Sequence, residues 1–176
     1  MKDFIVYINE KLKITKDILK QSKHNYHPKT REELKELVKK LISERGNNAD
    51  LNDIDTSKIT NMSDLFVFNE FNGDISLWNV SNVTDMTRMF YECKNFNSDL
   101  SKWNVSTGIN FSHMFHGCKE FNQDLSDWNV KNLMDITEMF RDSGMTYNLE
   151  RWGHKLHNKC KIKNALTNTP VTKSKR

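Results

Sequence analysis

The chain has 176 residues, of which 36% are hydrophobic, and its formal net charge is +4 at pH 7. This length suits one domain or one array of repeats, and no stretch approaches the ~18–20 apolar residues of a membrane-spanning helix. The first apolar run, residues 4–8, is shorter than the hydrophobic region of a signal peptide, so we expect a cytoplasmic protein with no membrane contact.

Charge is distributed unevenly along the chain. Residues 1–49 carry 12 basic and 7 acidic side chains, residues 50–150 carry 7 and 16, and residues 151–176 carry 8 basic and no acidic ones. The net charges of the three segments are therefore +5, −9 and +8. The acidic middle is typical of a solvated repeat surface, and it also fits a surface that attracts a basic partner.

The first segment, residues 1–49, predicts a helical N-terminal cap. Thr30 and Glu33 have the spacing of a capping box, and Gly46 occupies a position where helices commonly end. Between them, apolar residues recur at helical spacing: Leu34, Leu37, Val38, Leu41 and Ile42. An earlier, weaker helix is indicated by Phe4, Ile8, Leu12 and Leu19.

The middle of the chain is a repeat of about 25 residues. The tryptophans are spaced by 25, 25 and 24 residues, at Trp78, Trp103, Trp128 and Trp152. The first three each begin a similar sequence, such as WNVSNVTDMTRMFYECKNFNSDLSK, and a weaker copy occupies residues 54–77. A fixed period of this size is typical of arrays whose coils bury apolar side chains against one another. We predict an array of about four coils over residues 50–151.

Each copy predicts the same local structure. Residues that cap helix N-termini recur where the apolar positions begin, at Asn61, Asp85, Asn110 and Asp135. The Met–Phe or Leu–Phe pairs that follow indicate a short helical turn, and residues 100–105 are typical of a short strand, as is the entry at Ala49 and Leu51. The predicted fold class is an α/β repeat solenoid of leucine-rich-repeat type, with short parallel strands and short helical turns.

Two polar columns recur with the same period: Asp74, Asp99 and Asp124, and Asn72, Asn97 and Asn122. Carboxylates about 5 Å apart, the spacing of neighbouring strands, repel each other unless N–H donors or a cation compensate them. We expect ladders in which these side chains hold turn backbone, with bound Ca²⁺ as an alternative.

The three cysteines are Cys93, Cys118 and Cys160. The first two share one column of the repeat, which predicts small, buried side chains with free thiols. Neighbouring coils could bring them close enough for a disulfide, but cytosolic disulfides are rare.

The phrases W-N-V-S-x-V-T-x-M-x-x-M-F and F-N-x-D-L-S-x-W resemble the BspA-like leucine-rich repeats of bacterial and mobile-element proteins. The resemblance covers residues 54–152, with three near-complete copies in register. It implies a leucine-rich-repeat solenoid that binds another molecule rather than a catalyst. Many relatives are exported and some are adhesins, a role that the expected cytoplasmic location does not fit.

The last segment, residues 152–176, predicts a basic C-terminal cap and tail. Trp152, Leu156 and Cys160 are four residues apart, which favours a short capping helix, and residues 167–176 have the composition of a disordered end. The basic charge of the segment could contact nucleic acid, although aromatic residues are not interleaved with it.

Six histidines form three H-x-x-H pairs: His24 and His27, His113 and His116, His154 and His157. Such a spacing can present two imidazoles to a metal, and Cys160 adds a third ligand type to the last pair. Structural use is the simpler interpretation, so we predict no metal site and no cofactor.

No catalytic motif is present, and we predict that the protein is not an enzyme. Gly108 breaks the repeat, which indicates drift or a close approach of a partner.

Two columns vary freely between copies and predict a solvent-facing surface: Asp64, Arg88, His113 and Glu138 in one, and Tyr91, His116 and Arg141 in the other. Tyr and Arg are typical interface anchors, so these seven residues are the predicted partner-binding site. The function predicted is a protein–protein interaction module, of the kind that a phage or mobile element would encode to inhibit a basic or nucleic-acid-handling host defence protein. A nucleic-acid-binding accessory protein and a surface adhesion protein are the alternatives.

Overall fold

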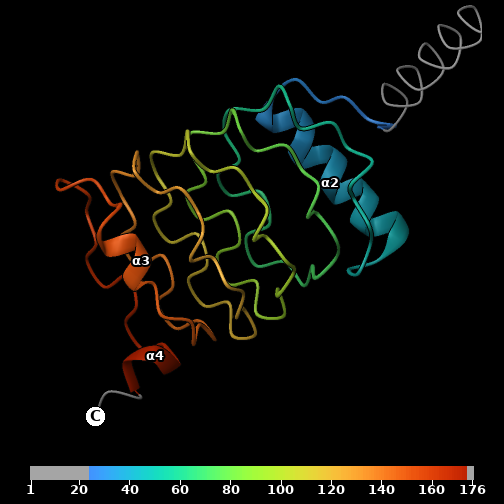
Figure 1. Cartoon of the computed structure of the whole chain (residues 1–176). Helices are drawn as coiled ribbons and strands as arrows, with labels where there is room; N and C mark the ends of the chain where they lie inside the picture. Colours follow the sequence, from blue (N-terminus) through green and yellow to red (C-terminus); the bar gives the residue numbers. More distant parts are fainter. Residues whose placement is uncertain (1–23, 174–176) are drawn as a thin grey trace, which may run out of the picture.

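The computed structural model describes residues 24–173. Its helices are α2 (Arg31–Arg45), α3 (Glu150–Gly153) and α4 (Pro170–Lys173). Figure 1 shows α2 at one end, α3 and α4 at the other, and a series of irregular coils side by side between them. None of the helices in the described residues is long and apolar enough to cross a membrane.

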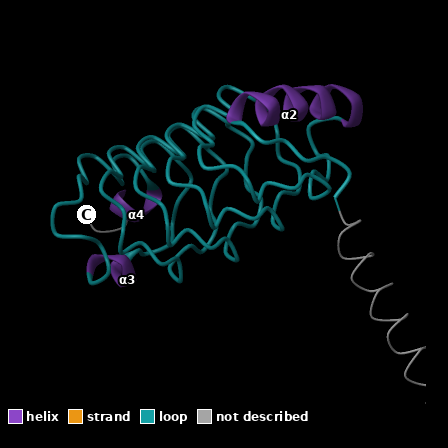
Figure 2. Cartoon of the chain, turned by 90° about the horizontal axis from the view of Figure 1, so that it is seen from above, coloured by secondary structure: helices purple, strands orange, loops and turns teal. Residues whose placement is uncertain are grey.

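The prediction of an α/β repeat solenoid with parallel strands is wrong. Residues 24–173 contain no strand, and the backbone between α2 and α3 consists of turns and irregular loop (Figure 2). Neighbouring coils are joined by isolated parallel bridges such as Asn61 with Asp85, Asp85 with Asn110, and Asn110 with Asp135. The expected first strand near Ala49 is likewise a single bridge, between Asp50 and Asp74.

Consecutive turns replace both the strands and the helical turns. At residues 100–105, the N–H of Trp103 donates to the carbonyl of Leu100 at 3.1 Å, which closes a turn where a strand was predicted. Asp85 does not cap a helix: its side chain accepts from the N–H of Thr87 at 2.9 Å and forms a local Asx turn. Arg88 then has φ of 55°, a left-handed conformation that ends any right-handed helix.

Alternate residues of these turns donate hydrogen bonds to the next coil. The N–H groups of Met86, Arg88 and Phe90 donate to carbonyls one copy later, at 2.9–3.0 Å. The N–H groups between them donate within the coil, as Met89 does to Met86 at 3.1 Å. Backbone polar groups are thus paired without a continuous sheet, because the donors alternate between local and inter-coil acceptors.

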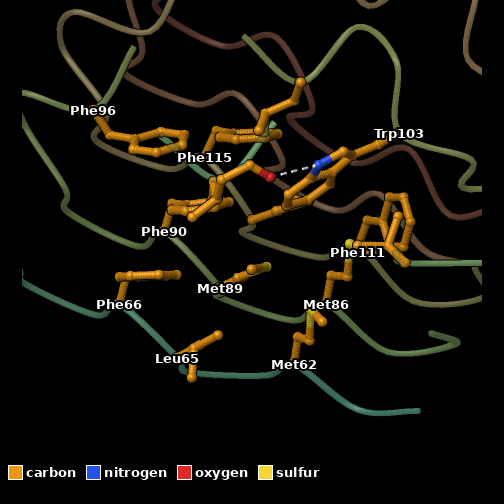
Figure 3. Close-up of a cluster of buried hydrophobic side chains, with 14 of the residues drawn as sticks. Met62, Leu65, Phe66, Met86, Met89, Phe90, Phe96, Trp103, Phe111 and Phe115 are labelled. Carbon is orange, nitrogen blue, oxygen red and sulfur yellow. Dashed lines mark hydrogen bonds between the residues drawn. The ribbon is translucent and has the colours of Figure 1, made fainter. Parts of the chain in front are cut away.

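The interior is a stack of aromatic columns (Figure 3). The rings of Phe66, Phe90, Phe115 and Phe140 follow one another with centroid distances of 5.2–5.5 Å. All four tryptophans are buried, and each indole N–H donates at 2.9–3.2 Å to a carbonyl of the preceding coil. The repeated Trp and Phe columns therefore supply both apolar burial and inter-coil hydrogen bonds.

The predicted cap helix is confirmed. Thr30 accepts from the N–H of Glu33 at 3.1 Å, and the Glu33 carboxylate accepts from the N–H of Lys29 at 2.7 Å. Gly46, with φ of 86°, donates to Ile42 at 2.8 Å and ends the helix. The buried side chains of α2 are Leu34, Val38 and Leu41. The weaker helix predicted from Phe4, Ile8, Leu12 and Leu19 lies outside the described residues.

The coil pattern continues past the last tryptophan. Phe140 and Asp142 donate to the carbonyls of Ala165 and Thr167 at 2.8 and 2.9 Å, as their equivalents do in earlier coils. A capping helix over residues 152–160 was predicted, but α3 is only four residues long and ends at Gly153. Residues 167–173, predicted as disordered, include α4 and the fully buried Thr169. The division into segments 1–49, 50–151 and 152–176 stays a prediction.

The polar and cysteine columns have the predicted roles. Asp74, Asp99 and Asp124 each accept from the N–H of the serine two residues later, at 2.8–2.9 Å. The Asn72 and Asn97 side chains accept from backbone N–H groups of the next coil. Cys93 and Cys118 are buried and free, and their thiols donate to the carbonyls of Phe66 and Phe90, respectively.

Candidate functional site

The seven residues predicted as a partner-binding site lie along one edge of the stacked coils, and we call this surface the variable face: Asp64, Arg88, Tyr91, His113, His116, Glu138 and Arg141. Four of them, one per coil, share the same left-handed backbone, with φ of 54–58°: Asp64, Arg88, His113 and Glu138. Non-glycine residues adopt this conformation rarely. The backbone of the variable face is therefore constant, while its side chains differ from coil to coil.

The first half of the variable face is built on arginine and tyrosine. Asp64 lies 3.6 Å from the guanidinium of Arg31 in α2 and 3.3 Å from that of Arg88. The Arg88 guanidinium also lies 5.1 Å from the centre of the Tyr91 ring, in cation–π contact. Tyr91 in turn stacks on His116, with ring centroids 4.9 Å apart.

The second half brings two histidines to one carboxylate. Glu138 Oε2 lies 3.5 Å from His113 Nε2 and 3.4 Å from His116 Nδ1. The other oxygen of Glu138 accepts from Arg141 at 3.0 Å and from Asn164 at 3.4 Å. Contacts thus run without a break from Asp64 in one coil to Arg141 three coils later.

The protonation states of the second half follow from burial and pairing. Burial lowers the pKa of His116, and this effect outweighs the opposing charge of Glu138, so its imidazole is neutral at pH 7. Burial raises the pKa of Glu138, but hydrogen bonds from Asn164 and Arg141 bring it below its ordinary value. The contact between Glu138 and His116 is therefore not an ion pair at neutral pH.

One polar atom of the site lacks a partner. His116 Nδ1 is buried and makes no hydrogen bond, although it lies 3.4 Å from Glu138 Oε2. Within residues 24–173, His113, His116 and Glu138 form the single group of three His, Cys, Asp or Glu side chains whose ligand atoms converge, all within 4.8 Å of one another.

The other histidine pairs behave differently. His154 is exposed at the end of α3, and the exposed His157 accepts from the N–H of Lys159 at 3.1 Å. His27 lies 3.3 Å from Asp55 instead of sharing a ligand set with His24. The combination of His154, His157 and Cys160, the stronger metal candidate by spacing, does not converge.

Phe68 is a functional candidate that the sequence analysis did not include. Its side chain is 69% exposed, and its ring meets Tyr91 edge-on with centroids 5.5 Å apart. It belongs to a third variable column, whose other members are Glu92, Gly117 and Asp142, and all four have positive φ. The same test of variation between copies would have found this column.

The family comparison covers most of the coils. No curated protein and no solved structure matches this sequence. Residues 32–152, from α2 to the fourth tryptophan, match the family described as "Mycoplasma protein of unknown function, DUF285". Since the match spans well over half of the chain, the protein belongs to the DUF285 family.

Proposed function

We propose that the protein is a non-enzymatic protein-interaction module that binds its partner with the variable face. The observation that carries this proposal is the unbroken row of side-chain contacts from Asp64 to Arg141, among residues that differ from one copy of the repeat to the next. The resemblance to BspA-like repeats supports it, since that family is associated with binding rather than catalysis.

The composition of the face suits an interface. Phe68 and Tyr91 offer adjoining aromatic surface, and Arg88 and Arg141 are held by acidic neighbours. Aromatic and arginine side chains dominate the energetics of protein interfaces. Side chains that are already held by neighbours lose less conformational entropy when a partner binds.

The proposed partner is a basic protein, such as a nucleic-acid-handling host defence protein that a phage or mobile element would inhibit. The net charge of −9 over residues 50–150 supports this choice, because complementary fields accelerate association. The cytoplasmic location is part of the same proposal.

The test is affinity capture from host lysate followed by quantitative binding to the captured protein. We expect Phe68→Ser with Tyr91→Ala to weaken binding at least about 30-fold, the effect of losing interface anchors worth about 2 kcal/mol. Tyr147→Ser is the matched control, because Tyr147 is 42% exposed and lies outside the variable face. Equal loss in both variants, or unchanged binding in the first, would exclude the variable face as the interface.

A second candidate function, nucleic-acid binding, is favoured by exposed cations in residues 151–163. Residues 151–176 contain no acidic side chain, and the basic residues whose exposure the structure describes are all exposed: Arg151, Lys155, Lys159, Lys161 and Lys163. Deleting the segment would remove the buried Trp152, so the test uses Lys155→Glu with Lys159→Glu. A salt-dependent gel shift that these substitutions abolish supports this function, and an unchanged shift contradicts it.

A further inference from the structure

We propose that His113, His116 and Glu138 form a binding site for a divalent transition-metal ion, with Zn²⁺ as the ion that fits best. The site lies within the variable face, but the inference stands on the geometry of three side chains and not on the proposed partner. It also departs from our prediction of no metal site, which considered each H-x-x-H pair within its own coil.

The spacing of the ligand atoms matches tetrahedral zinc. Zinc binds imidazole nitrogen and carboxylate oxygen at about 2.0–2.2 Å, which places neighbouring ligand atoms about 3.3–3.5 Å apart. Glu138 Oε2 lies 3.5 Å from His113 Nε2 and 3.4 Å from His116 Nδ1. Two of the three ligand separations therefore match already, and the third, between the nitrogens of His113 and His116, is within 4.8 Å.

The unsatisfied nitrogen of His116 points to a ligand. Nδ1 is buried and makes no hydrogen bond among the described residues, and buried polar atoms without a partner are uncommon and costly. A metal ion would accept the lone pair of the neutral imidazole. The carboxylate of Glu138, 3.4 Å away, supplies the charge that such an ion needs.

Neighbouring groups orient the proposed ligands. Arg141 and Asn164 donate to Glu138 Oε1, which leaves Oε2 directed at the histidines. The ring of His116 is held against Tyr91. Such outer contacts commonly fix the orientation of metal ligands and influence affinity.

The ligand types favour a transition metal, and the charges around the site favour a cation. Two imidazoles and one carboxylate suit zinc, cobalt or nickel rather than Mg²⁺ or Ca²⁺, which prefer oxygen ligands. Negative charges of Glu92 and Asp142 also act on His116, whereas Arg141 is the opposing cation next to Glu138. Three protein ligands leave a fourth position for water or for a side chain of a partner.

The test is calorimetric titration of untagged, full-length protein with ZnCl₂, with MgCl₂ as a comparison ion. We expect one equivalent of Zn²⁺ to bind, no saturable binding of Mg²⁺, and tetrahedral absorption bands when Co²⁺ is used. His116→Ala and Glu138→Gln should each weaken Zn²⁺ binding at least about 10-fold, because a lost ligand costs at least as much as a lost outer contact. The thermal midpoint should rise with Zn²⁺ in the parent protein and stay unchanged in Glu138→Gln.

The matched control removes the other candidate ligands, in His154→Ala/His157→Ala/Cys160→Ser. This variant keeps the parent affinity if the site is the one proposed. Parent protein that shows no saturable Zn²⁺ binding overturns the proposal, as does equal weakening by the control and by Glu138→Gln. Thermal unfolding without metal shows whether each variant folds, and His113→Ala replaces any variant that does not.

Discussion

Phe115 and His116 are neighbours in the sequence, yet they belong to two different regions of the molecule. Phe115 is fully buried in the aromatic core, stacked between Phe90 and Phe140, while His116 stacks on Tyr91 in the variable face. Both regions therefore repeat along the same axis on the same backbone. The core requires one kind of side chain in every coil, whereas the variable face accepts a different one in each, so variation between copies is informative about function.

The largest expected effect contrasts these two regions directly. Phe115→Ala should lower the free energy of unfolding by about 3–5 kcal/mol, since it leaves a cavity among stacked rings. Tyr91→Ala, which removes a ring of the variable face, should cost less than about 1 kcal/mol. Urea unfolding followed by circular dichroism measures both, and equal losses would contradict the separation into core and face.

A second prediction concerns the one copy that breaks the core pattern. A Cβ at Gly108 would lie 2.4 Å from the Phe111 ring, whereas the previous coil has Val83 and Met86 at these positions. The large Phe111 thus occupies space that the missing side chain leaves, which explains the break without a partner. Gly108→Val alone should cost about 1–3 kcal/mol through overpacking.

Adding Phe111→Met restores the pair of the previous coil and supplies the control. The loss in free energy of unfolding in the double variant should be smaller than the summed losses of the two single variants by about 0.5–3 kcal/mol, because the two side chains share one space. Additive losses in urea unfolding would show that Gly108 and Phe111 do not compete for the same space.

The core and the variable face could be predicted from the sequence because both depend on the repeat. The tryptophan spacing gives the period, and the Phe columns give the interior. The replacement of strands and helical turns by consecutive turns could not be predicted, because the left-handed residues Arg88 and His113 carry no sequence marker such as glycine. The convergence of His113, His116 and Glu138 could not be predicted for another reason: Glu138 comes from the coil after the two histidines, so no single copy contains all three.

The coil after the last tryptophan also follows the repeat in its backbone without showing the repeat in its sequence. Lys161 takes the place of the Asn or Asp that begins each earlier turn, so the sequence signal is lost. Its bridge to Asp135 nevertheless continues the series, and Asn164 and Asn168 have the left-handed φ of their equivalents. The backbone pattern persists because the preceding coil supplies donors that need acceptors.

The smallest expected effect lies in the polar column outside both regions: Asp74, Asp99 and Asp124. Hydrogen bonds from backbone N–H groups two residues later lower the pKa of each carboxyl. The unfolded chain therefore takes up protons first, at about pH 4, and stability present above that pH is lost as the pH falls through the lower folded pKa values.

Asparagine keeps the acceptor oxygen but cannot titrate, so the triple variant Asp74→Asn/Asp99→Asn/Asp124→Asn should show a shallower loss of thermal midpoint between pH 5 and about pH 3. An equally steep loss in the triple variant would assign the acid sensitivity to other carboxylates, such as Asp53 beside Arg45, whose hydrogen bond also lowers its pKa.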